Sequence, residues 1–407
     1  MKNRLLASIF LIVFIDLLGF SIILPLLPYY AETFGASPFM IGLLTASYAA
    51  AQFLGAPLMG RLSDRFGRRP VLILSIAGTF AGFVMLALAN NLIILFASRF
   101  IDGLTGGNIT VAQAYITDVT DRKSRAKGLG MIGAAFGLGF IFGPAVGGLL
   151  SQFGYAVPAM LAAALSFVNL GLVTLWLPES LTAERRAAIA QSRRPAFSVN
   201  SLAKALARPY VGPLLHTRFF FGLAFSKFQT VFALYGQARF GINAANTGFI
   251  LAYVGVLSAF TQGFLIGRIT SRIPDDQLVF WGIGLMAVSL LGWALAPSMI
   301  VLLIVLIPTA LSGGVLNTVL SSALTKSVRP DEIGGTLGLS SSLESLTRVI
   351  APSLGGLMIE RIGSAAPGLF GFAIMALLFS YAYRFILNSA PSEPSDNRAE
   401  AIPVKID

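Results

Sequence analysis

Six charged residues lie inside long apolar stretches of this sequence. They are Asp16, Arg99, Asp102, Lys227, Glu344 and Arg348. Charge within an apolar stretch of this length is costly and usually functional. Burial favours the neutral form of a carboxyl group, whereas a nearby arginine favours the charged form. A change of solvation or partner can therefore load and release a proton, and a cationic or polar substrate can compete for the same carboxylate.

The spacing of these charges predicts which of them can meet. Asp102 follows Arg99 by one helical turn and Arg348 follows Glu344 by four residues, so each pair shares a helix face. From the helical rise, Asp16 lies about 16 Å from one membrane edge and Arg99 about 12 Å from the other. In an apolar core about 30 Å thick these depths agree to within a turn. Asp16 and Arg99 are therefore candidates for an ion pair or a shared water cavity.

The composition indicates that the elements holding these charges are membrane-spanning helices. The chain is 56% hydrophobic and 12% charged, whereas about 25% of the residues of soluble domains are charged. A spanning helix needs about 20 mostly apolar residues. Such segments are predicted at 5–30, 40–60, 71–89, 92–116, 128–150, 156–177, 211–235, 246–267, 278–297, 299–322, 335–359 and 366–387. The predicted fold class is an all-α membrane protein with twelve transmembrane helices in two six-helix halves.

Lysine and arginine set the expected orientation. Nearly all of those outside the spans fall in the termini and in the loops on one side, whereas the opposite loops hold only Arg239 and Arg361. Both termini are therefore expected in the cytoplasm, with the chain in the inner or plasma membrane. The formal charge of +11 is explained by this placement and does not indicate nucleic-acid binding.

Two motifs recur in the same order and at nearly the same offset. Residues Gly60–Arg65 resemble Gly267–Arg272, and Phe142–Leu150 resemble Ile350–Met358. The chain is therefore predicted to be a parallel duplication whose halves rock about a central site.

The expected domains follow from this repeat. Two six-helix bundles are predicted at 1–177 and 211–387. Between them, 178–210 is a polar, basic cytoplasmic linker, expected in part as an amphipathic helix on the membrane surface. The tail 388–407 has a disordered composition.

Four short motifs connect the chain to a known family. The first is the loop Gly60-Arg-Leu-Ser-Asp64-Arg65-Phe-Gly67-Arg68-Arg69. The others are Leu18-Gly19 followed by Pro25 and Pro28, then Arg99-x-x-x-Gly103-x-x-x-Gly107, then Gly139-x-x-x-Gly143-Pro144-x-x-Gly147-Gly148. By these motifs the chain resembles the major facilitator superfamily, and within it the twelve-span drug/proton antiporters, especially the tetracycline-resistance efflux branch.

The resemblance implies roles for the first and last motifs. Asp64 of the loop is expected against the start of the eleventh span, as a latch that opens when the halves rock, and glycines are expected where the loop turns tightly. The other candidate gating residues of this loop are Gly60, Arg65, Gly67, Arg68 and Arg69. The glycines and Pro144 of the fifth span are expected to allow close helix contact and bending, in a seam that favours exchange over leak.

The substrate cavity is expected near aromatic and polar residues of the fourth and seventh spans. The candidates are Gln113, Lys227, Phe228, Gln229 and Phe232. Such a lining suits a bulky amphipathic molecule, although lipid-facing phenylalanine is the alternative. Gly82, Met286 and Ser258 stand where the tetracycline branch has polar residues, so tetracycline itself is not the expected substrate.

Other chemistries find little support. The chain has no cysteine and a single histidine, His216, so no metal site, cofactor or hydrolytic triad is expected. It also has no nucleotide-binding P-loop. The expected function is proton-coupled export of a small molecule by a monomer. The alternatives are transport of a sugar, metabolite or lipid-like compound and, more distantly, a membrane receptor.

Overall fold

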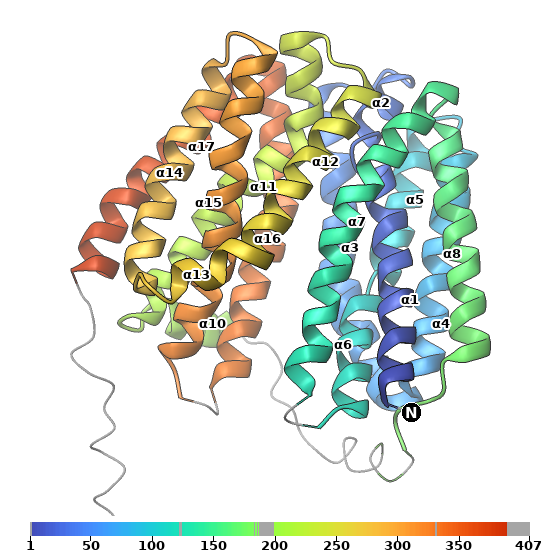
Figure 1. Ribbon diagram of the computed structural model, residues 1–407. Helices are drawn as coiled ribbons and strands as arrows, with labels where there is room; N and C mark the ends of the chain where they lie inside the picture. The colour runs from blue at the N-terminus through green and yellow to red at the C-terminus, as the bar shows by residue number, and fades with distance from the viewer. Residues whose placement is uncertain are drawn as a thin grey trace, which may run out of the picture.

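The computed structural model describes residues 2–121, 124–182, 184, 186, 199–329 and 332–388. The expected tail lies almost wholly outside these ranges, as does much of the linker. The first half contains α1 (Lys2–Ile23), α2 (Leu27–Glu32), α3 (Pro38–Phe66), α4 (Arg68–Ala87), α5 (Leu92–Thr105), α6 (Asn108–Val119), α7 (Arg125–Leu150), η1 (Ser151–Phe153) and α8 (Ala156–Trp176) (Figure 1).

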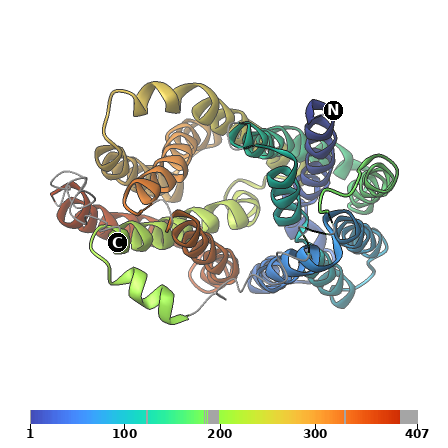
Figure 2. The same cartoon turned by 90° about the horizontal axis from the view of Figure 1, so that it is seen from below.

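The second half follows α10 (Val199–Leu206), which belongs to the linker. It contains α11 (Val211–Phe240), α12 (Ala244–Phe260), η2 (Thr261–Leu265), α13 (Ile266–Thr270), α14 (Asp275–Leu295), α15 (Met299–Lys326), α16 (Ile333–Arg361), α17 (Ala366–Ala382) and η3 (Tyr383–Leu387). The two halves lie side by side as separate groups of helices (Figure 2). The predicted all-α membrane fold is confirmed.

Ten helices in the described part of the chain are long and apolar enough to cross a membrane. α11 and α16 are long enough too, with 30 and 29 residues, but they contain charged residues. These two helices carry Arg218, Glu344 and Arg348, and they pack against each other. Their polarity thus reflects the charged residues that they place inside the second half.

The fourth predicted span is broken rather than continuous. α5 ends at Thr105 and α6 begins at Asn108, with Gly106 and Gly107 between them. The carbonyl groups freed by the break are still bonded: Ser75 Oγ donates to Thr105 O, and Gln52 Nε2 donates to Gly106 O at 3.2 Å. Such a break is tolerated in a membrane because neighbouring side chains satisfy the backbone. It brings Asn108 to the start of a helix in mid-bundle.

The halves contact each other mainly through two helix pairs, α3 with α16 and α7 with α12. We call the end of the bundle where α1 begins and α3 ends the basic end. At the opposite end backbones touch, because a methyl group on Gly42 would overlap the Pro352 carbonyl and one on Gly356 would overlap that of Pro38.

At the basic end the same interface is open. Methyl groups built on Gly130, Gly133 and Gly137 of α7 would meet no described atom within 4 Å beyond their own helix backbone and chain neighbours. The same holds for Gly334 and Gly338 near the start of α16. The structure is therefore closed at the end opposite the basic end and parted at the basic end.

Candidate functional site

Asp16 of α1 lies against the break in the fourth span. Asn108 Nδ2 donates a hydrogen bond to Asp16 Oδ2, while Asp16 Oδ1 is buried without a hydrogen-bond partner among the described residues. Beside them is a cavity of about 10 Å³ with apolar walls from α1, α4 and α6, a volume close to that of one water molecule. Asp16 and Asn108 are the polar residues that line this cavity.

Arg99 and Asp102 form a buried ion pair on α5. The distance from Arg99 Nη1 to Asp102 Oδ2 is 3.0 Å, and both side chains are under 5% exposed. The Arg99 guanidinium also lies over the Phe83 ring, 5.2 Å from its centroid. The expected pairing of Asp16 with Arg99 is thus corrected: Arg99 pairs within its own helix, and Asp16 with Asn108.

Asp102 also explains the glycine at position 82. A methyl group on Gly82 would stand 2.9 Å from the Asp102 Cβ. A larger acidic side chain at position 82 would therefore need the space that Asp102 occupies. Position 82 has room only for a small residue beside Asp102.

Tyr48 of α3 was missed by sequence reasoning, because one tyrosine in an apolar span carries no distinctive signal. Its hydroxyl accepts a hydrogen bond from Gln52 Nε2 at 3.1 Å, and its ring lies 5.2 Å from that of Phe20. Gln52 also donates to Gly106 O at 3.2 Å, so Tyr48 lies beside the break in the fourth span.

The second half holds a four-residue charged cluster, in which Glu344 is the centre. Glu344 Oε2 accepts from Arg218 Nη2 at 2.5 Å, and Glu344 Oε1 accepts from Arg348 Nη2 at 2.6 Å. Arg218 also donates to Asn317 Oδ1 at 2.9 Å. The expected Glu344–Arg348 contact is present. Arg218, which the sequence places nearer the end of its span, joins it because α11 packs along α16.

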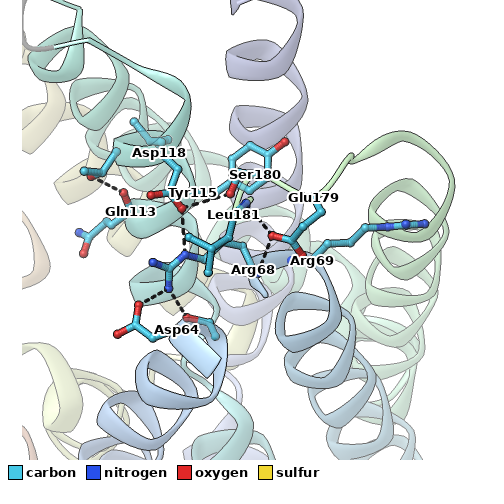
Figure 3. A network of polar contacts seen from close by, with 12 residues as sticks. Asp64, Arg68, Arg69, Gln113, Tyr115, Asp118, Glu179, Ser180 and Leu181 are labelled. Carbon is cyan, nitrogen blue, oxygen red and sulfur yellow. Dashed lines mark hydrogen bonds and ion pairs between the residues drawn. The ribbon is translucent and has the colours of Figure 1, made fainter. Parts of the chain in front are cut away.

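The motif loop at the end of α3 forms a polar network with the fourth and sixth spans (Figure 3). Arg68 is buried between two carboxylates, 2.7 Å from Asp64 Oδ1 and 3.0 Å from Asp118 Oδ2. It also donates to Ser63 Oγ at 2.7 Å. Arg65 is exposed. In this conformation Asp64 is held by Arg68 of its own half. The expected contact of Asp64 with the start of α16 stays a prediction.

Glu179, after the sixth span, caps the start of α4. Its carboxylate accepts from the backbone N–H groups of Arg68 at 2.9 Å and Arg69 at 3.1 Å, where a negative charge is favoured. Gly67 has φ 109° and a methyl group there would overlap Glu179, so this glycine is required. Gly60 is different: it lies inside α3, and a methyl group there would have an ordinary contact of 3.6 Å.

The small residues of α7 face two different helices. Methyl groups on Gly139, Gly143 and Gly147 would press on α1 of the same half. Gly148 faces the other half, because a methyl there would stand 2.8 Å from the carbonyl oxygen of Ala245 in α12. The predicted close-contact seam is thus present, and Pro144 forms part of it.

Polar contacts reinforce the closed end. Tyr29 Oη lies 2.7 Å from Thr247 Oγ1 and donates to Ile242 O at 2.9 Å. Phe39 N donates to Glu360 Oε2 at 3.0 Å. Each contact joins one half to the other, so the closed end is held by hydrogen bonds as well as by packing.

The predicted aromatic lining needs correction. Phe228 and Phe232 are at most 1% exposed and belong to the hydrophobic core of the second half. The Phe228 ring packs edge-on against Trp293. Gln113 is exposed on α6, whereas the side chains of Lys227 and Gln229 are outside the described part of the structure. The helical spacing of the phenylalanines does not show whether their side chains fill a hydrophobic core or line a cavity.

His216 and Met286 have structural surroundings. His216 Nδ1 lies 3.1 Å from the Tyr381 hydroxyl, and Met286 is fully buried in the core of the second half. No group of three or more histidine, cysteine, aspartate or glutamate residues able to hold a metal occurs in the described residues.

Two bundles joined at one end, with charged groups buried between their helices, define a secondary transporter. The family model of the Major Facilitator Superfamily matches residues 9–308 and 264–406, and the chain belongs to this family. It is a multi-pass membrane transporter of a small molecule, not an enzyme.

Relatives of known function are similar over most of the chain. The tetracycline resistance protein, class C, of Escherichia coli is 34% identical over 86% of this chain and 88% of its own length. Solute carrier family 22 member 18 of Mus musculus is 31% identical over 83% and 85%. In structure, the human organic anion transporter MFSD10 superposes with a TM-score of 0.69 at 23% identity, over 94% of this chain and 99% of that one.

Proposed function

We propose that this protein exports a small amphipathic molecule from the cell in exchange for protons. The basic end then faces the cytoplasm, as the positive-inside rule requires, and the structure represents the state open to the cytoplasm. The start of α1 and the end of η3 lie at that end (Figure 1). The observation that carries the proposal is the Asp16 carboxylate, buried in the first half with one oxygen unpartnered beside a water-sized cavity.

Protons would be taken up and released by one buried carboxylate of the first half. Asp16 is held by a neutral amide, so protonation breaks no ion pair there. Asp102 is different, because it must remain charged for as long as it pairs with Arg99. Asp16 is therefore the proton carrier in this proposal, and the Arg99–Asp102 pair is a fixed neighbouring charge pair.

Alternating access would come from the helix pairs that join the halves. In the state described here, backbone contacts and the Tyr29 and Phe39 hydrogen bonds close the external end. Rocking would break these contacts and bring together the glycine-lined faces of α7 and α16 at the basic end. A proton bound from outside and a substrate bound from inside would favour opposite movements, which produces exchange.

The tetracycline-resistance relatives support a drug-like substrate. The chain differs from that branch at Gly82, but Asp102 occupies the adjoining space. The proposal therefore covers amphipathic, drug-sized molecules as a class rather than tetracycline itself. A single chain suffices for this mechanism, because both halves and the interface between them belong to one chain.

The test is proton movement in proteoliposomes that hold an acidic interior and a pH-sensitive dye. Adding amphipathic probes of varied charge, with tetracycline and ethidium among them, should dissipate the gradient with the wild type and not with Asp16→Asn. Asp276→Asn, at the basic end of α14, is the matched control and should behave as the wild type. Normal coupling in Asp16→Asn would refute the assignment, and failure of the whole panel with the wild type would refute proton exchange.

A further inference from the structure

The cluster on α11 and α16 has more positive than negative charge. Both oxygens of Glu344 are engaged, one by Arg218 and the other by Arg348. The remaining partner, Asn317, is neutral. Two guanidinium groups therefore share one carboxylate, and the cluster keeps a net charge of +1 near the middle of the 29-residue helix α16. An uncompensated charge at this depth is costly and marks a functional site.

The two arginines have different surroundings. The Arg218 side chain is 10% exposed and its Nε has no hydrogen-bond partner among the described residues. Arg348 is 55% exposed, and arginine presents several N–H donors in one plane. Arg218 thus holds Glu344 from the buried side. Arg348 is more exposed and has further N–H groups that can bind a ligand.

Arg348 points toward the space between the halves. Pro352 and Gly356 follow it by four and eight residues, so the three share one face of α16. Those two residues touch Gly42 and Pro38 of α3 across the closed interface. Arg348 is one turn nearer the basic end, where the interface opens. Across this interface lies α3, the helix that carries Tyr48.

We propose that Arg348 binds an acidic group of the transported molecule, so the substrate class is an amphipathic organic anion. Planar carboxylates and sulfonates match the paired N–H groups of a guanidinium. The rings of Tyr48 and Phe20, 5.2 Å apart, would lie beside the apolar part. This assignment rests on the proposed export function and names its substrate. It differs from the expectation from the sequence, in which a cationic or polar substrate competes for a carboxylate.

The site can be tested with two naphthalene probes that share one ring system and carry opposite charges. Calorimetry on purified protein in lipid nanodiscs would compare naphthalene-2-sulfonate with 2-naphthyltrimethylammonium. The wild type should bind the sulfonate more tightly than the ammonium compound. Arg348→Gln should weaken sulfonate binding about tenfold or more, the usual effect of losing a charge-assisted hydrogen bond. Arg348→Lys should retain part of the affinity. Arg384→Gln, an exposed arginine after α17, is the control and should bind as the wild type.

Removal of the Glu344 carboxylate should change sulfonate binding in the opposite direction. Glu344→Gln leaves both arginines without their counter-charge, so sulfonate binding should tighten and the ammonium probe should bind no better. It also provides a test if Arg348→Gln fails to fold. Weaker sulfonate binding in Glu344→Gln, or wild-type preference for the ammonium probe, would overturn the assignment.

Proton exchange and the anion site can be refuted independently of each other. If the ammonium probe alone dissipates the pH gradient in proteoliposomes, proton exchange stands and the anion site falls. If the sulfonate binds in an Arg348-dependent way but moves no protons, the anion site stands and proton exchange falls.

Discussion

Gly248 of α12 lies directly against the carbonyl oxygen of Pro144 in α7, so closely that a methyl group on Gly248 would overlap it. The two residues belong to different halves, and the contact lies at the closed end of the bundle. A helix that lacks a side chain at one point lets another helix approach to backbone distance. The close approach of α7 and α12 at the closed end thus requires a glycine at position 248.

Gly248→Val should favour opening of that end, because overpacking costs about 1–3 kcal/mol in the closed state only. The chain has no cysteine, so Ala244→Cys can report access to this interface, where Ala244 is 4% exposed. A membrane-impermeant maleimide should label it several-fold faster when Gly248→Val is present. Gly263→Val, at a glycine with open space around it, is the control. Unchanged labelling would show that this contact does not hold the closed state.

Arg68→Gln should destabilise the first half by about 3–5 kcal/mol, because it removes a buried cation that lies between the Asp64 and Asp118 carboxylates. Thermal unfolding in detergent measures the change. Arg65→Gln, at an exposed arginine three residues earlier, should stay within about 0.5 kcal/mol of the wild type. Equal effects of the two substitutions would contradict the structural role assigned to Arg68.

Gly67→Ala and Glu179→Ala should interact in a double-mutant cycle. The first places an alanine at φ 109° and ψ 158°, at a cost of about 1–3 kcal/mol, and adds the overlap with Glu179. The second removes the cap of α4, at a cost of about 0.5–2 kcal/mol. Because the overlap disappears with Glu179, the double variant should be less destabilised than the two single effects added, by about 0.5–3 kcal/mol. Additive unfolding free energies would show that the overlap is relieved elsewhere.

Arg208, at the end of the linker, holds Glu332 at the start of α16 by two hydrogen bonds of 3.1 and 3.2 Å. These bonds lower the pKa of Glu332 below its ordinary 4.5. Since the folded pKa is depressed, the stabilisation is present above pH 4.5 and is lost as the pH falls through the folded pKa. Thermal unfolding of Glu332→Gln should therefore fall below that of the wild type at neutral pH. The two should converge at acidic pH, and a constant difference would exclude the ion pair as its source.

The sequence determined the spans, the duplication and the identity of the charged residues, because apolar length, a repeated motif and a charge inside an apolar stretch are local signals. It also supplied the contacts between near neighbours on one helix, Arg99 with Asp102 and Glu344 with Arg348. Helical spacing alone brings such residues together.

Only the tertiary structure decided which distant residues meet. Asp16 pairs with Asn108 because the fourth span breaks at Gly106 and Gly107, and a break shifts a helix face without changing the apolar pattern. Arg218 reaches Glu344 because α11 lies along α16, whereas Phe228 turns into the core. These outcomes depend on the rotation and packing of whole helices, which no local pattern specifies. The excess positive charge around Glu344 is likewise visible only when both arginines are seen on one carboxylate.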